Sequence, residues 1–158
     1  NYPIRITRYE LVEDSEGAGC QRGGLGIRRD YQFIDHHASF TVLADRDRWG
    51  PWGLFGGSPG KKASYLLNPD GEARSLGCKT TISLTPGDVV SYRTCGGGGY
   101  GPPENRNPEK VLNDVLEGKV SLSRARDVYR VVIDPDSSEI NHEQTEQYRG
   151  HTDSEATG

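Results

Sequence analysis

The stretch TCGGGGYGPP, residues 94–103, sets four consecutive glycines between a strand-like run and a helix-like run. A flexible linker is also rich in glycine, but this run ends on Tyr100 and on Pro102 and Pro103, which restrict the backbone. Glycine permits close backbone approach and positive φ, and its bare amides can line a pocket for an anion. We therefore expect a shaped loop, either a pocket wall or a loop packed tightly on a sheet.

The composition fits one domain built of short strands. The chain has 158 residues, enough for a single hydrophobic core, yet only 32% of them are hydrophobic and the mean hydropathy is -0.75. With 21 glycines and 9 prolines, turns are frequent, which favours β structure over a helical bundle. The sequence contains no methionine and begins within a strand-like run, so we expect a piece of a longer chain.

Charge and cysteine content argue against several classes of protein. A net charge of -4 disfavours a general nucleic-acid binder, which requires a basic surface. No run approaches the ~20 apolar residues that cross a bilayer, and the first residues lack the apolar core of a signal peptide. Cys20, Cys78 and Cys95 have no metal-type spacing. We expect a reduced, cytoplasmic protein that holds no metal and contacts neither membrane nor nucleic acid.

Alternating apolar and polar residues predict several strands. Ile4 and Ile6 suit a half-buried strand near the start of the chain. Later strand faces are expected from Ile27, Arg29, Tyr31 and Phe33, and from Phe40, Val42 and Ala44. Turns are expected at NPDG, residues 68–71, and at TPGD, residues 85–88. The runs TTISL and DVVSYRT on either side of TPGD are the best candidates for a hairpin.

After the glycine run, the sequence pattern indicates helices. Asn107 suits the cap of a helix, Pro108 its first position and Gly118 its end. The apolar stripe between them consists of Val111, Leu112, Val115 and Leu116. Ser121 is expected to open a second short helix, and YRVVI, residues 129–133, a last strand.

These elements predict a mainly β fold, a sandwich or distorted barrel with two short helices near the C-terminus. The predicted β-rich domain covers residues 1–134. Residues 135–158 contain almost no apolar side chains, so we expect a flexible polar tail there.

Two motif-like stretches do not match a functional pattern. GGSPGKKAS, residues 56–64, has Phe55 where a phosphate loop needs its first glycine and Lys62 where it needs Ser or Thr, so a turn is favoured. His36 and His37 would point to opposite faces of a strand, which favours a solvent-facing pair over a metal site.

The sequence also gives no specific signal for a catalytic nucleophile or for a dinucleotide-binding site. No serine stands in the strained-elbow pattern of a hydrolase, and Cys95 is more readily a buried or neutral thiol than a nucleophile. GAGCQRGG, residues 17–24, departs from the dinucleotide fingerprint because Arg22 stands where the last glycine belongs. The catalytic residues therefore stay unassigned.

Three blocks, taken in order, resemble the carboxy-terminal part of the hydantoinase B / 5-oxoprolinase family. They are YPIRITRYELVEDSEGAGCQRGGLGIRRDYQFI at 2–34, RDRWGPWGLFGGSPGKKASYLLNPDG at 46–71, and LTPGDVVSYRTCGGGGYGPPENRNPEKVLNDVLEGKVSLSRARDVYRVVI at 84–133. The resemblance covers about residues 2–134 and gives the glycine run a fixed place before Tyr100.

The resemblance implies a subunit of an ATP-dependent amidohydrolase complex that opens cyclic amides such as hydantoin or 5-oxoproline. Ketone carboxylation, as in acetone and acetophenone carboxylases, is the alternative, and a purely structural assembly module is another. The implied partners are a hydantoinase A-type ATPase subunit and the amino-terminal part of the B-type subunit, which makes a hetero-oligomer. ATP and a divalent metal are expected on those partners, and this chain alone is expected to be inactive.

Two sets of residues are candidates for a role in such a complex. The substrate-lining candidates are Arg22, Gly23, Gly24, Cys95, Gly97, Gly98 and Tyr100. For Arg22, a salt bridge that pins a turn is favoured slightly over binding of a phosphate or carboxylate. The interface candidates are Trp49, Trp52, Leu54 and Phe55, a dense apolar cluster in one loop. Such a cluster marks a subunit interface if exposed and core if buried, and both alternatives stay open.

Overall fold

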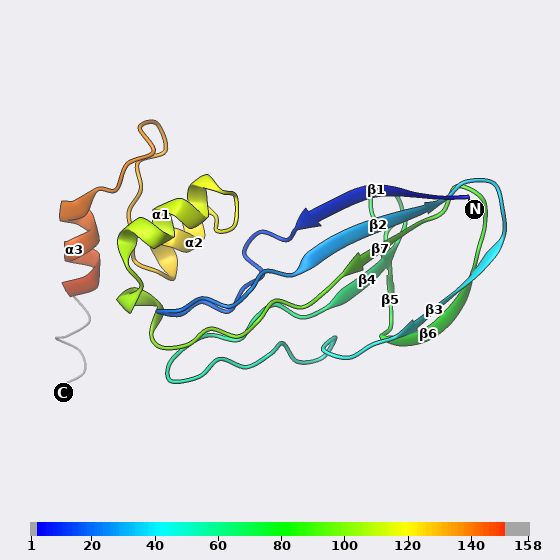
Figure 1. The fold of residues 1–158 in the computed structure, drawn as a ribbon, viewed down its shortest axis with the longest axis horizontal. Helices are drawn as coiled ribbons and strands as arrows, with labels where there is room; N and C mark the ends of the chain where they lie inside the picture. Colours follow the sequence, from blue (N-terminus) through cyan, green and yellow to red (C-terminus); the bar gives the residue numbers. More distant parts are fainter. Residues whose placement is uncertain (1–2, 151–158) are drawn as a thin grey trace.

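The computed structural model describes residues 3–150, which form two antiparallel sheets and three short helices (Figure 1). The strands are β1 (Ile4–Leu11), β2 (Ile27–Phe33), β3 (Ala38–Leu43), β4 (Ser64–Leu67), β5 (Arg74–Leu76), β6 (Lys79–Leu84) and β7 (Val89–Arg93). The helices are α1 (Pro108–Leu116), α2 (Leu122–Asp127) and α3 (His142–Gly150), with a 3-10 turn at Pro103–Asn105. None of these helices is long and apolar enough to cross a membrane.

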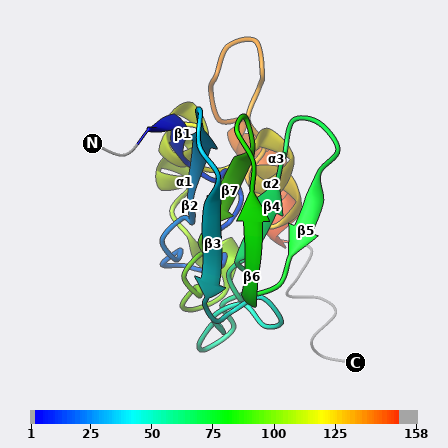
Figure 2. The same cartoon turned by 90° about the vertical axis from the view of Figure 1, so that its right-hand side faces the viewer.

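The two sheets pack as a sandwich of unequal layers. The larger sheet has the strand order β1-β2-β7-β4-β5, and the smaller sheet consists of β3 and β6 alone. Phe33, Leu84 and Val90 are buried between the layers, and they come from three different strands of the two sheets. Figure 2 shows the two-stranded sheet in front of the larger one, between β1 on one side and β5 on the other. The predicted mainly β sandwich is confirmed, and the described sheets do not close into a barrel.

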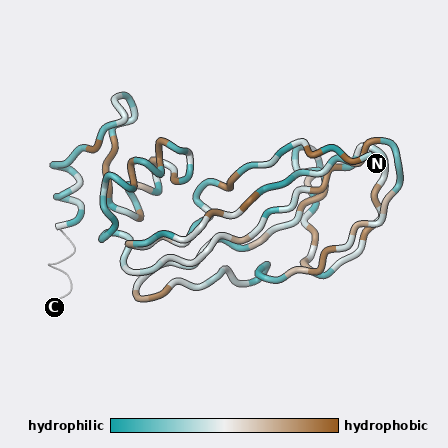
Figure 3. The backbone as a smooth tube through the Cα atoms, in the orientation of Figure 1, coloured by the Kyte–Doolittle hydropathy of each residue, from teal (hydrophilic) through white to brown (hydrophobic). Residues whose placement is uncertain are grey.

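The helices form a second core at the other end of the molecule (Figure 1). Its buried side chains are Ala18, Val111, Val120, Ala125, Tyr129 and Val131. The predicted helix boundaries are confirmed: the Asn107 side chain accepts a hydrogen bond from the Glu109 amide, and Gly118 ends the helix with φ +66. Ser121 caps α2 through the Arg124 amide. Glycine-rich extended segments connect the two cores and are pale in the hydropathy colouring of Figure 3.

The predicted turn at TPGD forms, but the hairpin prediction is wrong. The Asp88 amide donates to the Thr85 carbonyl at 3.1 Å, and Gly87 has φ +92, as a type II turn requires. The strands on either side belong to different sheets, because β6 pairs with β3 while β7 pairs with β2 and β4. Leu84 and Val90 both enter the space between the layers, so the turn carries the chain from one layer to the other.

The strand predicted at Ile4 and Ile6 forms as β1, but the prediction that it is half-buried is wrong. Every residue of β1 is exposed, and Ile6 retains 54% of its accessible surface. The strand lies at the edge of the larger sheet, and the two-stranded sheet is too narrow to cover it. A register shift between Ile6 and Arg8 places Tyr9 and Leu11 opposite Arg29 and Ile27, which leaves a row of apolar side chains uncovered.

Residues 129–133 do not form the predicted strand. Their amides and carbonyls bond to helix ends instead: the Val131 amide donates to the Ala125 carbonyl and the Val132 amide to the Thr145 hydroxyl. Tyr129 and Val131 are fully buried in the helical core, so the apolar character of YRVVI reflects burial there. Only Ile133 makes a single bridge, to Ile140.

A third helix, α3, occupies part of the segment 135–158 whose composition predicts a polar tail. Thr145 is buried, and the Arg149 guanidinium donates to the backbone carbonyls of Arg106 and Tyr129. The sequence does not indicate this attachment, because α3 is held by hydrogen bonds and has no apolar stripe that a pattern would show. Residues 151–158 of the predicted tail lie outside the described residues.

Candidate functional site

The glycine run belongs to an array of extended segments that bond to one another without a β ladder. The Lys61 amide donates to the Ser15 carbonyl and the Gly96 amide to the Lys61 carbonyl, at 2.9 and 3.1 Å. The same pattern recurs three residues along each segment, where the Ser58 amide donates to the Ala18 carbonyl and the Gly99 amide donates to the Ser58 carbonyl. A three-residue repeat is that of the polyproline II conformation, whose amides and carbonyls point outward to neighbouring chains. We call residues 15–24, 51–61 and 96–101 the glycine array.

Close approach explains why glycine is needed in this array. A Cβ atom on Gly96 would stand 1.8 Å from the Ser15 carbonyl oxygen, and one on Gly98 would stand 1.9 Å from that of Trp52. A Cβ atom on Gly23 would meet the Gly97 oxygen at 2.1 Å. These contacts are far below van der Waals separation, so the backbones touch only because the side chains are absent.

Most amides of the array are already used within the protein. The Gly97 amide donates to the Gly24 carbonyl at 2.8 Å, and the amides of Tyr100 and Gly101 donate to Gln21 and Leu54. In the stretch resembling a phosphate loop, the amides of Ser58, Gly60 and Lys61 are likewise bonded to carbonyls. Amides bound in this way do not cradle a phosphate. The geometry supports tight packing as the role of the glycines.

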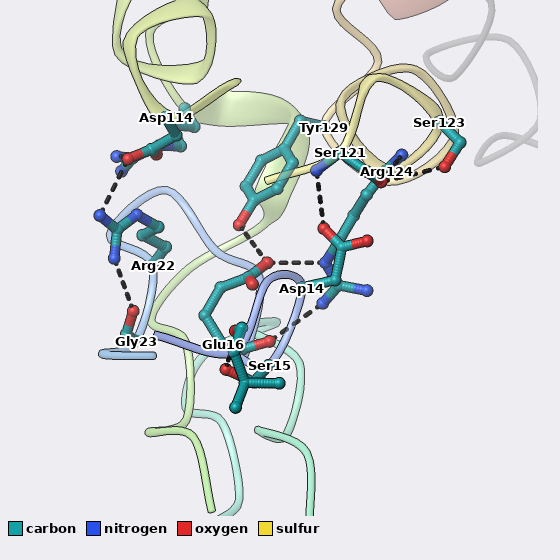
Figure 4. Close-up of polar contacts among 12 residues, drawn as sticks. Asp14, Ser15, Glu16, Arg22, Gly23, Asp114, Ser121, Ser123, Arg124 and Tyr129 are labelled. Carbon is teal, nitrogen blue, oxygen red and sulfur yellow. Dashed lines mark hydrogen bonds and ion pairs between the residues drawn. The ribbon is translucent and has the colours of Figure 1, made fainter. Parts of the chain in front are cut away.

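A buried carboxylate, Glu16, anchors the array to the helices (Figure 4). Its Oε1 atom accepts a hydrogen bond from Arg124 Nε at 2.6 Å and another from the Tyr129 hydroxyl at 3.1 Å. Arg124 also donates to the Glu16 backbone carbonyl, and Asp14 accepts from the Ser121 amide. Burial and the neighbouring Glu16 carboxylate raise the pKa of Tyr129. The turn at residues 13–17 is thereby fixed against α2.

A second anchor pairs two arginines with one carboxylate of α1. Arg22 Nη2 lies 2.8 Å from Asp114 Oδ1, and Arg106 Nη2 lies 2.8 Å from Asp114 Oδ2. Arg22 also donates to the Gly23 carbonyl, and Arg106 to the Cys20 carbonyl (Figure 4 shows the Arg22 contacts). The hydrogen bond with Asp114 raises the pKa of Arg22. Both arginines thus fasten the glycine-rich turn at 20–24, as the salt-bridge interpretation of Arg22 expects.

The structure brings most, but not all, of the substrate-lining candidates together. Gly23, Gly24 and Gly97 meet within the array beside Arg22. Tyr100 lies at the surface of the array, 52% exposed, with its ring 5.2 Å from that of Phe55. Cys95 lies apart from them and packs on a cluster of the sheet end that contains Val42, Ala63 and Tyr65.

The interface candidates are all exposed. Trp49 retains 79% of its surface, Phe55 76%, Trp52 69% and Leu54 51%. Together with Tyr100 we call them the aromatic surface; Leu54 and Tyr100 form a bridge within the glycine array, and the Phe55 ring contacts that of Tyr100. Exposed aromatic side chains in such number are typical of a docking site for another protein.

A pocket opens beside the two tryptophans. It is lined by Arg46, Trp49, Gly50, Trp52, Pro59, Gly60, Lys61 and Lys62. The Arg46 guanidinium lies 5.2 Å from the centre of a Trp52 ring, within the range of a cation–π interaction. All three ionisable residues of the lining are cationic.

A second, apolar groove of about 600 Å³ runs between the unequal layers. One wall is formed by Ile27, Arg29, Tyr31 and Phe33 of β2, and the other by residues 40–44. Residues 40–44 line it consecutively, so the groove is bordered by the edge of β3 that is not paired with β6. Arg29, which lines the groove, stacks on the Tyr9 ring at 4.2 Å.

Several of these residues escape sequence analysis. Glu16 is a buried carboxylate whose Tyr129 partner lies 113 residues away, so no local pattern identifies it, and Asp114 is a second buried carboxylate. A signal for Asp114 does exist, because it interrupts the apolar stripe of α1 next to Val115 and yet faces inward. Among residues 3–150 no group of three or more His, Cys, Asp or Glu side chains is placed to hold a metal ion. His36 packs on Phe33.

Comparison with known proteins identifies the family. The hydantoinase B/oxoprolinase family model matches residues 1–103. The B subunit of a putative D-/L-hydantoinase from Pseudomonas sp. (strain NS671) is 37% identical over 152 residues, which cover 94% of this chain and 25% of that protein. The beta subunit of the caprolactamase from Pseudomonas jessenii is 39% identical over 144 residues, covering 85% of this chain and 24% of that protein.

A solved structure of an ATP-dependent acetone carboxylase in its nucleotide-free state has the same fold. Its TM-score is 0.81 at 20% identity, and the match covers 99% of this chain and 26% of that one. The chain spans about a quarter of the length of these relatives. Since the family model matches well over half of the 158 residues, the chain belongs to the hydantoinase B/oxoprolinase family.

Proposed function

We propose that the chain works as part of an ATP-dependent amidohydrolase complex that opens cyclic amides of the hydantoin or 5-oxoproline type. The support comes from two relatives whose names state a hydantoinase subunit and a caprolactamase subunit. Within the complex this segment shapes one side of the substrate chamber and docks other subunits. The reacting groups come from elsewhere in the assembly.

The observation that carries this proposal is the aromatic surface on its rigid base. Trp49, Trp52 and Phe55 are exposed, while the backbone beneath them is fixed by the hydrogen bonds and close contacts of the glycine array. A surface held rigidly in its binding conformation loses little conformational entropy on association. Such a surface suits permanent docking of a partner, for which we propose a hydantoinase A-type ATPase subunit.

The remaining partner is the amino-terminal part of a B-type subunit. The apolar groove, the exposed row on β1 and the free edge of β3 together form an uncovered face. An uncovered sheet face with a free edge is a site where a further strand adds. We propose that the rest of the longer subunit covers this face.

ATP and the divalent metal belong to those partners in this proposal. The amides that would cradle phosphate are bonded to carbonyls, and the described residues hold no group of metal ligands. No catalytic step is therefore assigned to a metal or nucleotide on this chain. The complex is proposed to work in the cytoplasm.

An alternative function is ATP-dependent ketone carboxylation, favoured by the fold shared with acetone carboxylase. A second alternative is a structural module that only assembles other chains, favoured by the dense internal bonding of the glycine array. We rank cyclic-amide opening first because two relatives are named as a hydantoinase subunit and a caprolactamase subunit.

Native mass spectrometry of the complex, followed by assays of ATP-coupled turnover, tests the proposal. We expect the 17.4 kDa chain to be held with larger subunits that release ADP when hydantoin, 5-oxoproline or caprolactam is added. ADP release with acetone and bicarbonate alone would support the carboxylase alternative. A chain that is monomeric in the native material would overturn the proposal.

A further inference from the structure

The pocket beside the tryptophans combines aromatic walls with unpaired positive charge. Within residues 3–150 no carboxylate forms an ion pair with Arg46, Lys61 or Lys62, and none lines the pocket. The chain as a whole carries a net charge of -4, so this concentration of cations runs against its overall charge. A local cationic patch on an acidic protein selects a complementary acidic ligand.

The backbone around this pocket is fixed in place. The Gly60 amide donates to the Pro51 carbonyl, the Lys61 amide to Ser15 and the Ala63 amide to Arg46. A Cβ atom on Gly50 would stand 1.9 Å from the Gly60 oxygen, so the two arms of the loop are in direct contact. The pocket is therefore preformed, with the indole rings and the cationic side chains carried on a rigid frame.

The two indole rings remain exposed beside these charges. Tryptophan and arginine are the residues most enriched at the energetic centres of protein interfaces. Trp49 and Trp52 retain more than two thirds of their surface, which is a large apolar area to leave in water. Leu54 and Phe55 of the aromatic surface follow two and three residues after Trp52 on the same loop.

We propose that this pocket receives an acidic segment of the partner subunit, with an apolar or aromatic side chain between carboxylates. The apolar side chain packs on Trp49 and Trp52, and the carboxylates pair with Arg46, Lys61 and Lys62. This inference rests on the proposed function, since it specifies the chemistry of the partner that docks on the aromatic surface.

Intrinsic fluorescence gives a direct test, because the chain contains two tryptophans and both line this pocket. The probe is the blocked peptide Glu-Glu-Phe-Glu-Glu, titrated into the 158-residue chain at low salt. We expect a blue shift of the emission that saturates, and an affinity that falls about tenfold between 50 and 300 mM salt as screening shortens the reach of the charges. The peptide Lys-Lys-Phe-Lys-Lys is expected to give no saturable shift.

Charge reversal identifies the cations responsible. The double variant Lys61→Glu/Lys62→Glu is expected to weaken binding of the acidic peptide by at least about tenfold. The matched control is Lys110→Glu/Lys119→Glu, which makes the same change in net charge on the helical end and is expected to bind as the unaltered chain does. Equal binding by both double variants, or no saturable shift, would overturn the inference. So would a tighter response to ATP or inorganic phosphate than to the peptide.

Peptide binding and the assembly and turnover of the complex test the inference and the proposed function separately. If the complex assembles and turns over cyclic amides with the Lys61→Glu/Lys62→Glu variant as well as with the unaltered chain, the inference fails and the proposed function stands. If the peptide binds as expected but the native chain is monomeric, the proposed function fails and the acidic specificity of the pocket stands.

Discussion

Glu16 and Tyr129 are separated by 113 residues in sequence, yet the Tyr129 hydroxyl donates a hydrogen bond of 3.1 Å to the Glu16 carboxylate. Both side chains are fully buried, and Arg124 supplies the balancing charge from α2. This contact joins the turn that begins the glycine array to the helical core. The rigidity of the array thus depends on a charged group that has no access to water.

Replacement Glu16→Gln tests this anchor. The amide keeps the size of the side chain but leaves the Arg124 guanidinium without its buried anionic partner, so we expect a loss of about 3–5 kcal/mol in the free energy of unfolding. Urea denaturation followed by circular dichroism measures it. Glu139→Gln, an exposed residue, is the control and is expected to change stability by less than about 0.5 kcal/mol. A Glu16→Gln protein as stable as the control would show that the anchor is dispensable.

Alkaline pH is expected to destabilise the protein through Tyr129. Its pKa is raised in the folded state, first by burial and then by Glu16, so the unfolded chain loses the phenolic proton at a lower pH than the folded chain. The stabilisation is complete below the unfolded pKa near 10 and is lost as the pH rises beyond it, with a slope of about 1.4 kcal/mol per pH unit for this group.

Urea denaturation at several pH values between 9 and 11.5 measures that slope. The variant Tyr129→Phe removes the titrating group and is expected to flatten the dependence by about one proton. Some dependence remains, because burial also raises the pKa of Tyr65. An unchanged slope in Tyr129→Phe would mean that other groups account for the alkaline loss.

Alanine substitution in the glycine array is expected to be severe. The methyl group of Gly98→Ala would overlap the Trp52 carbonyl oxygen, and relief requires the separation of hydrogen-bonded backbones. We expect a loss of more than about 3 kcal/mol, or no folded protein. Gly77→Ala is the matched control, because nothing lies within 4 Å of its added Cβ atom. Thermal unfolding compares the two, and equal melting temperatures would contradict the packing role of the array.

Local signals in the sequence are sufficient to predict the elements whose stability is local. Asn107, Pro108 and Gly118 mark the ends of α1 because capping and helix termination depend on neighbouring residues alone. The same holds for the Pro86-Gly87 turn. The turn residues do not encode which sheet each flanking strand joins, so they do not predict that β6 pairs with β3.

The glycine array shows a second limit of prediction from the sequence. The four glycines of residues 96–99 indicate a shaped loop, but their hydrogen-bond partners at Gly24, Ser58 and Lys61 come from segments tens of residues away. Which segments meet is a property of the whole fold. Alternation at Ile4 and Ile6 similarly predicts a strand, whereas their burial depends on what covers that edge of the sheet, and within the described chain β1 stays exposed.

That uncovered face leads to a final prediction, on the association of the isolated chain. Leu43 is 81% exposed on β3, beside the apolar groove and on the strand edge that β6 leaves free. Exposed apolar side chains next to a free edge favour pairing with other chains, and a lysine there opposes it. We expect the isolated protein to bind a hydrophobic dye and to self-associate, and Leu43→Lys to reduce both by about half or more. Leu116→Lys on α1, a leucine that is 58% exposed and lies on a helix, is expected to leave association unchanged. Light scattering over a range of concentrations measures the self-association of each variant. Equal association of both variants would mean that the β3 edge is not the part of the surface that mediates self-association.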